Sequence, residues 1–250
     1  MSTQPQVIVQ PSLEALSREA AARFQRLAAE SVAAAGRFSV ALSGGSTPRA
    51  LYELLAKPPF HETIDWPRVH LFWGDERFVP ADHPDSNYRM AREALIGNVP
   101  IPTENVHPVP TEGSDPEASA AQYEEALRRF FSPPQGQVPR FDLVLLGLGT
   151  DGHTASLFPG SPALDESHRL VVAAYIQKLD AWRLTFTPPI LRGARHVIFL
   201  VCGPHKAAAL QEVLEGPYDP QRLPAQLVLP QEGDVTWLVD EAAASLLQRS

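Results

Sequence analysis

The sequence has little of several features that would point to particular classes of protein. It contains one cysteine, Cys202, in 250 residues, so an internal disulfide is excluded, which fits a reducing compartment. The longest apolar runs are under ten residues, too short for a transmembrane helix. Residues 1–10 lack the basic and apolar regions of a secretory signal. We therefore expect a cytoplasmic protein with no membrane partner.

Positive charge is not concentrated anywhere along the chain. Lysine and arginine number 21 against 29 acidic residues, giving a net charge of −8, and no Lys/Arg cluster stands out. Because nucleic-acid-binding domains usually carry a basic patch, we expect no nucleic-acid partner. An anionic small molecule is compatible with this composition, provided that the fold gathers positive charge locally.

Ligand spacings typical of a metal site are also missing. Asp82, His83 and Asp85 are of suitable residue types, but no two histidines stand four residues apart and there are no cysteine partners. The sequence therefore predicts no metal.

The chain does contain a regular alternation of strand-like and helix-like segments. Apolar, β-branched runs predict strands at 6–10, 38–43, 69–73, 141–147, 170–176, 183–187, 196–202 and 235–239. Segments rich in alanine, leucine and glutamate predict helices at about 12–35, 48–56, 86–96, 116–130, 204–214 and 240–249. This alternation predicts an α/β fold with a mostly parallel sheet and helices on both faces. No repeat or linker divides the chain, so we expect a single domain over residues 1–250.

Polar, glycine-rich segments directly follow four of the predicted strands. They are 43–48 (SGGSTP), 74–77 (GDER), 147–153 (GLGTDGH) and 203–206 (GPHK). Open α/β sheets bind their ligands at the carboxyl ends of the strands. Since parallel strands end at the same edge, we expect the four segments to form one site.

The segment 147–153 allows three interpretations. Its first six residues match the G-x-G-x-x-G pattern of dinucleotide-binding folds, but Pro159 and Pro162 interrupt the helix that should follow. No acidic residue ends a second strand about 20 residues further on, so we expect no nucleotide cofactor. A plain tight turn and a catalytic loop remain. In a catalytic loop His153 would be a general base, and Asp151 is near enough in sequence to orient it.

The other segments contain groups suited to an anion. Gly44 and Gly45 let the backbone approach a ligand, Ser46 or Thr47 can cap the following helix, and free N–H groups at a helix start bind anions. The candidate contacts are Ser43, Gly44, Gly45, Ser46, Thr47, Arg49, Arg77, Arg183 and Lys206. Asp75 is the candidate acid that orients an arginine or His153. For each cation, the alternative is a solvated side chain or a local ion pair.

The chain resembles the 6-phosphogluconolactonase family in five ordered motifs. These are ALSGGSTPRALYELL, WGDERFVPADHPDSNYRMA, FDLVLLGLGTDGHTASLFPGS, RLTFTPPIL and GPHKAAAL, which lie between residues 38 and 240. The resemblance implies a doubly wound, Rossmann-like fold without a cofactor. It also implies hydrolysis of the sugar-phosphate lactone of the pentose phosphate pathway, in its oxidative branch.

The same resemblance implies roles for individual residues. His153 matches the histidine that activates water, and Arg77 matches an arginine of the substrate pocket. Positions expected around the substrate phosphate are Ser43, Gly44, Gly45, Arg49 and Lys206. Two questions stay open: whether Asp75 or Asp151 positions His153, and whether the chain is a monomer or a small homo-oligomer.

Two other functions are compatible with such a fold. The related glucosamine-6-phosphate deaminases have a carboxylate five residues beyond the histidine, where this chain has Phe158. Similar folds also serve as non-catalytic sugar-phosphate-sensing domains joined to DNA-binding helices. Because a strand is predicted at 6–10, close to the first residue, we expect no such helices in this chain.

Overall fold

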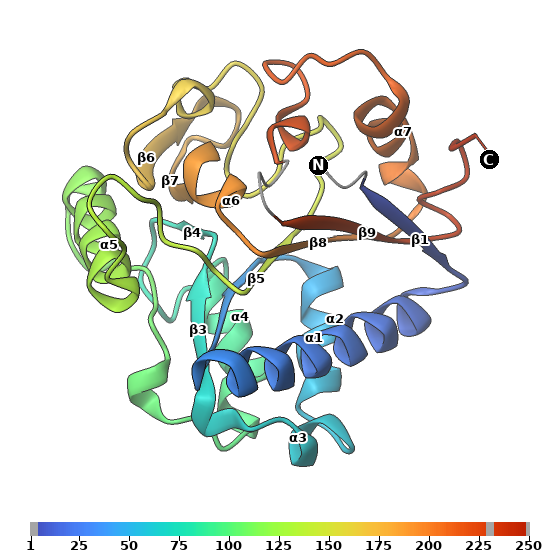
Figure 1. Ribbon diagram of the computed structural model, residues 1–250. Coiled ribbons are helices and arrows are strands. Elements are labelled where there is room, and N and C mark those ends of the chain that lie inside the picture. The colour runs from blue at the N-terminus through green and yellow to red at the C-terminus, as the bar shows by residue number, and fades with distance from the viewer. Residues whose placement is uncertain (1–4, 229–232, 249–250) are drawn as a thin grey trace.

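The chain folds around a six-stranded parallel sheet (Figure 1). The computed structural model describes residues 5–228 and 233–248. In spatial order the strands are β1 (Gln6–Gln10), β9 (Asp234–Asp240), β8 (His196–Val201), β5 (Leu143–Leu146), β2 (Phe38–Leu42) and β3 (Val69–Trp73). From β2 the chain moves outward to β3, and from β5 it moves the other way to β8 and β9. The predicted doubly wound α/β fold is confirmed, and its strand order reverses between β2 and β5.

Helices cover both faces of this sheet, with α1 and α2 on one side and α6 and α7 on the other (Figure 1). The α-helices of the described residues are α1 (Leu13–Ala35), α2 (Ser46–Leu55), α3 (Phe60–Thr63), α4 (Asn87–Ala94), α5 (Pro116–Phe131), α6 (Pro188–Arg192) and α7 (Ala207–Glu215). Among these residues, no helix is both long and apolar enough to cross a bilayer.

Helix α1 illustrates how the local sequence sets these elements. Its buried residues include Leu16, Ala20 and Phe24, spaced by four, so one face of the helix packs on the core. The Ser12 hydroxyl caps the start by accepting from the Ala15 N–H at 3.2 Å. Gly36, with a φ of 74°, ends the helix in the left-handed conformation that glycine adopts without strain.

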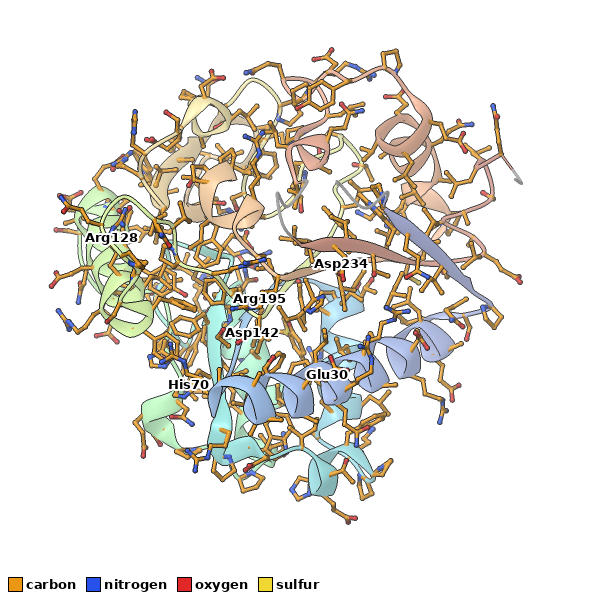
Figure 2. The ribbon with its side chains drawn as sticks, viewed as in Figure 1. Glu30, His70, Arg128, Asp142, Arg195 and Asp234 are labelled. Carbon is orange, nitrogen blue, oxygen red and sulfur yellow. The ribbon has the colours of Figure 1, made fainter. Side chains whose placement is uncertain are left out.

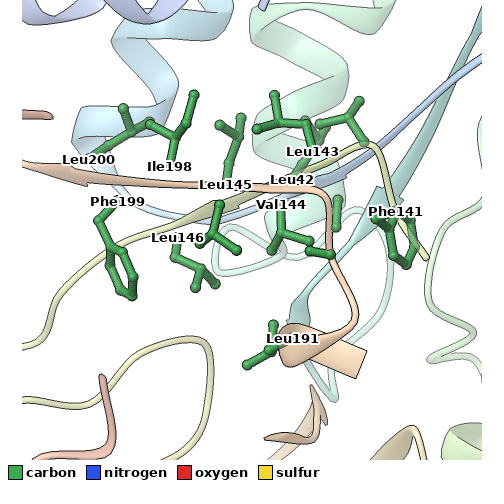
Figure 3. Close-up of a cluster of buried hydrophobic side chains, with 14 of the residues drawn as sticks. Leu42, Phe141, Leu143, Val144, Leu145, Leu146, Leu191, Ile198, Phe199 and Leu200 are labelled. Atoms are coloured by element: carbon green, nitrogen blue, oxygen red, sulfur yellow. The ribbon is translucent and has the colours of Figure 1, made fainter. Parts of the chain in front are cut away.

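The central strands are buried on both faces, as their continuous apolar sequences predict. Every residue of β2 and β5 is buried. Figure 3 shows the alternation in β8, where Ile198 and Leu200 point to one side of the sheet and Phe199 to the other. Phe199 stacks on Trp237 of β9 with ring centroids 3.8 Å apart. The carboxyl ends of these strands are thus held by a rigid core.

A second sheet corrects one detail of the prediction. The expected strands at 170–176 and 183–187 do not join the parallel sheet. They form the antiparallel pair β6 (Val171–Ile176) and β7 (Ala181–Phe186), and β4 (Asp75–Arg77) adds to β7. The connection between β6 and β7 is short, and a short connection permits antiparallel pairing only.

The expected helix at about 240–249 is absent from the described residues. Asp240 belongs to β9, and residues 241–246 form turns. Ala243 is fully buried but Leu246 is 49% exposed, so the segment buries little that would stabilise a short helix. Residue 249 lies outside the described residues. The short helices α3 and α6 were not predicted.

The amino-terminal edge of the sheet is held together by polar contacts. Asp142, labelled in Figure 2, accepts hydrogen bonds from the backbone N–H and hydroxyl of Ser39 at 2.8 and 2.7 Å. Its other oxygen lies 3.4 Å from Nε of Arg195. These contacts tie β2, β5 and β8 together at the edge opposite to the four polar segments.

Candidate active site

The carboxyl-terminal edge of the parallel sheet carries a pocket of about 230 Å³. Residues from all four polar segments line it, together with Asn87 of α4 and Ala155, which follows the third segment. The lining residues are Ser43, Gly44, Gly45, Asp75, Arg77, Asn87, Gly147, Leu148, Gly149, His153, Ala155 and Lys206. Larger hollows of about 710, 790, 530 and 240 Å³ lie elsewhere in the described part of the chain, and His153 lines none of them. The pocket lies beside the reversal between β2 and β5, where ligands bind in doubly wound folds.

His153 and Asp151 form a hydrogen-bonded pair in the loop after β5. The imidazole Nδ1 lies 2.5 Å from Asp151 Oδ1. A carboxylate at Nδ1 favours the tautomer with the proton on that nitrogen, which leaves Nε2 free to accept a proton. The loop is closed by backbone bonds, with Gly149 N–H donating to the His153 carbonyl at 2.8 Å. Between the two candidate acids, the structure therefore places Asp151 against the imidazole.

Gly149 is required where it stands because the pair fills the space beside it. A Cβ at this position would lie 2.0 Å from His153 Nδ1 and 2.7 Å from Asp151 Oδ1. Gly44 is equally restricted, since a Cβ there would lie 1.9 Å from Oδ1 of Asn87. Both glycines thus allow the backbone to pass directly against side chains of the pocket.

Burial affects the ionisation of the pair. Burial lowers the pKa of His153 and the Asp151 carboxylate raises it, and the net shift is downward from the usual value. For Asp151, partial burial opposes ionisation, but hydrogen bonds from Lys178 and His153 hold the pKa well below its usual range. At neutral pH both shifts favour a neutral imidazole beside a carboxylate, the state in which an imidazole can accept a proton.

Asp75 lines the pocket without contacting the imidazole through a hydrogen bond. Its Oδ2 accepts from the Ser156 hydroxyl at 2.7 Å, and its backbone carbonyl accepts from Nδ2 of Asn87 at 2.9 Å. Only 9% of Asp75 is exposed. The carboxylate is thereby fixed in place beside the loop that holds His153.

Glu76 attaches α4 to the site. Its buried carboxylate accepts from the backbone N–H groups of Arg77, Asn87 and Tyr88, each at 2.7 Å. Burial raises the pKa of Glu76 even though these hydrogen bonds oppose the shift. Negative charge is favourable at a helix start, so Glu76 fixes the position of Asn87 at the pocket wall.

Two arginines lie side by side next to the pocket. Arg77 of β4 and Arg183 of β7 are register partners, and neither Nε, although buried, has a hydrogen-bond partner among the described residues. Burial, together with Arg77, lowers the pKa of Arg183. The buried Ser43 hydroxyl also lacks a partner in that part of the chain. Buried donors without acceptors are costly, and adjacent guanidinium groups favour an anion between them.

Other predicted anion contacts differ in position. Lys206 lines the pocket, and burial lowers its pKa. Arg49 is not among the lining residues; its Nε pairs with Glu53 at 2.9 Å and half of the side chain is exposed. Gly45 is the N-cap residue of α2, and neither Ser46 nor Thr47 caps the helix as expected. The first N–H groups of α2 thus have no side-chain cap.

Lys178 and the packing of Phe158 were not predicted from the sequence. Lys178 lies between β6 and β7, where its Nζ forms an ion pair with Oδ2 of Asp151. The Phe158 ring stacks on His153 with centroids 4.1 Å apart and planes at 27°. Nothing in the local sequence indicates that residue 178 folds back onto residue 151. Asn87 could have been predicted, because it directly follows Ser86, which caps α4, in the motif WGDERFVPADHPDSNYRMA.

No three histidine, cysteine or acidic side chains come together as a metal site within the described ranges. Of the residues considered as metal ligands, Asp82 accepts a hydrogen bond from Arg89 at its backbone carbonyl, and His83 Nδ1 accepts one from the backbone N–H of Asp85 at 3.2 Å.

Comparison with known proteins places this arrangement in one family. The family model described as glucosamine-6-phosphate isomerases/6-phosphogluconolactonase matches residues 11–237. A 6-phosphogluconolactonase from Synechocystis sp. is 48% identical over 219 residues, which cover 88% of each chain. The solved 6-phosphogluconolactonase from Trypanosoma cruzi has a TM-score of 0.88 at 36% identity, covering 100% of this chain and 99% of its own. That from Trypanosoma brucei has a TM-score of 0.85 at 32% identity, covering 99% and 100%.

Proposed function

This chain belongs to the family of glucosamine-6-phosphate isomerases and 6-phosphogluconolactonases, and on that premise we propose that it hydrolyses 6-phospho-D-glucono-1,5-lactone to 6-phospho-D-gluconate. The observation that carries the proposal is the imidazole of His153, which lines the pocket with Nδ1 held by Asp151 at 2.5 Å. This leaves Nε2 as a base in a pocket that also contains cations.

The hydrolysis follows from these groups in two steps. His153 Nε2 accepts a proton from water as the water oxygen bonds to the lactone carbonyl carbon, and the carbonyl oxygen takes the negative charge. Arg77 is the cation of the pocket that stabilises this oxyanion. When the carbonyl re-forms, the bond to the ring oxygen breaks and the imidazolium returns its proton to that oxygen. Asp151 stabilises the imidazolium between the steps.

The phosphate of the substrate accounts for two of the unpartnered donors. Phosphate oxygens would accept from Arg183 Nε and the Ser43 hydroxyl, which have no partner in the described structure. The uncapped start of α2 and Lys206 add N–H donors and charge to the same end of the site. Arg49, paired with Glu53 outside the pocket, has no part in this arrangement.

The other branch of the family catalyses isomerisation with loss of ammonia, which needs a further acid–base group. Where that branch carries its carboxylate, this chain has Phe158, whose ring is 4.1 Å from that of His153. A phenyl ring packed on the imidazole cannot transfer a proton. This contact favours lactone hydrolysis.

The experiment is to generate the lactone from glucose 6-phosphate immediately before use and follow its disappearance. We expect the protein to accelerate hydrolysis well above the spontaneous rate, and to release no ammonia from glucosamine 6-phosphate. Tight binding of 6-phosphogluconate with no acceleration would point to a sensor. Release of ammonia would assign the chain to the deaminase branch.

A further inference from the structure

We propose that Lys178 is a positioning residue that holds both Asp151 and Phe158 around the imidazole of His153. The inference rests on the proposed hydrolysis and adds to it a residue outside the pocket lining. Three contacts carry it: Lys178 with Asp151, Lys178 with Phe158, and Phe158 with His153. The first two join the turn Gln177–Leu179, between β6 and β7, to the loop after β5.

The first contact fixes the carboxylate. Oδ1 of Asp151 is hydrogen-bonded to His153, to Nδ1 at 2.5 Å and to the backbone N–H at 3.3 Å, and Oδ2 pairs with Nζ of Lys178. A carboxylate held at one oxygen can rotate away from its partner, whereas one held at both cannot do so without breaking the second bond. The ammonium group therefore keeps Oδ1 directed at the imidazole.

The second and third contacts fix the ring face. The ammonium nitrogen of Lys178 lies 4.5 Å from the centroid of the Phe158 ring, a cation–π distance. That ring stacks on His153, and it packs in a small buried cluster with Ala174 and Ile176 of β6. The hairpin thus supports the imidazole twice, at its edge through Asp151 and at its face through Phe158.

The charge of Lys178 also bears on the imidazole. Burial is the largest influence and lowers the pKa of His153, Asp151 raises it, and Lys178 lowers it again. The charged groups around His153 come from four parts of the chain: Asp151, Lys178, Asp75, Arg77 and Lys206. Without the lysine, this opposing positive charge is lost, while the His153 backbone N–H still keeps the Asp151 carboxylate beside the imidazole. The protonated imidazole therefore becomes more favourable.

The test compares Lys178→Met, which keeps an apolar stem over Phe158, with Lys178→Arg, which keeps the charge. Lys57→Met is the matched control, because Lys57 is an exposed lysine on the connection after α2, away from the pocket lining. NMR titration of the His153 ring in each purified protein is the first readout. The pH profile of kcat and KM for the lactone is the second.

We expect Lys178→Met to move the His153 titration and the acid limb of kcat to higher pH. At the plateau kcat should fall by roughly fivefold or less, the scale of a half-exposed ion pair, with KM unchanged. Lys178→Arg should show the His153 titration and the kcat of the parent protein, and Lys57→Met should change neither of these quantities. A His153 titration in Lys178→Met identical to that of the parent protein overturns the inference, as does an arginine variant that shifts as far as the methionine one. Because NMR needs no turnover, a shifted titration in a protein without lactonase activity would refute the proposed function and leave this inference standing.

Discussion

Gly149→Ala is the substitution that the geometry of the site forbids most clearly. The added Cβ would lie 2.0 Å from His153 Nδ1, whereas ordinary contact begins near 3.4 Å, so one of the two must move by about 1.4 Å. Asp151 Oδ1 is too close as well, at 2.7 Å. A misplacement of roughly 1 Å in a catalytic group can cost about 10²-fold in rate, or about 2.7 kcal/mol in activation free energy. We expect kcat to fall by at least that factor.

The assay is the initial rate of lactone hydrolysis, with circular dichroism and thermal unfolding to confirm the fold. Gly113→Ala is the control, because a Cβ in this loop before α5 would meet no atom closer than 3.7 Å among those described. It should leave kcat unchanged. A folded Gly149→Ala protein with kcat within twofold of the parent would refute the view that the pair must keep its present position.

Three further predictions follow from other parts of the molecule. Arg183→Ala and Lys206→Ala should each lower kcat/KM for the phosphorylated lactone about tenfold to a hundredfold, the effect of losing a charge-assisted contact, and should hardly change hydrolysis of glucono-δ-lactone. Arg49→Ala should change the rate with neither substrate. Equal losses on the two substrates in Arg183→Ala or Lys206→Ala would refute a phosphate role for that residue. Dialysis against a strong chelator should leave the rate unchanged, since the chain lacks metal-ligand spacings; restoration by one divalent ion after a loss would contradict this. Burial, and to a smaller extent the charges of His107 and Arg37, lower the pKa of His70 from 6.5 to about 4. Between pH 6.5 and pH 4 the unfolded chain therefore binds more protons than the folded chain, and the free energy of unfolding falls as the pH drops from 6.5. In urea titrations at about pH 7 and pH 5, His70→Leu should show a smaller fall than the parent protein, and an equal fall would exclude His70 as the cause.

Much of the fold was predictable because its signals are local. Continuous apolar runs at β2, β5 and β8 predicted buried parallel strands, and the glycine-rich segments after them predicted a shared edge. The pairing of β6 with β7 and β4 was missed, because strand type follows from the connection between strands rather than from the strand sequences. The helix expected at about 240–249 was wrong, because alanine and leucine favour a helix only where packing stabilises it.

The candidate site could also be predicted in part, where its contacts are local in the sequence. Asp151 and His153 are two residues apart, so their contact lies within reach of local reasoning. Lys178 is 27 residues from Asp151, and a hairpin in the second sheet brings them together. Arg49 follows the predicted anion-binding turn in sequence, but its position on α2 directs it to Glu53, four residues on. Sequence proximity to a turn does not decide which face of the helix a side chain occupies.

The central claim is that the imidazole of His153 is the base that activates water. The most direct test is kcat for the freshly made lactone in His153→Ala, with the affinity for 6-phosphogluconate measured alongside to show that the pocket is intact. Loss of a general base lowers rates by roughly 10²-fold or more. We expect a fall of that size with product affinity little changed. A folded His153→Ala protein with near-full turnover would contradict the claim.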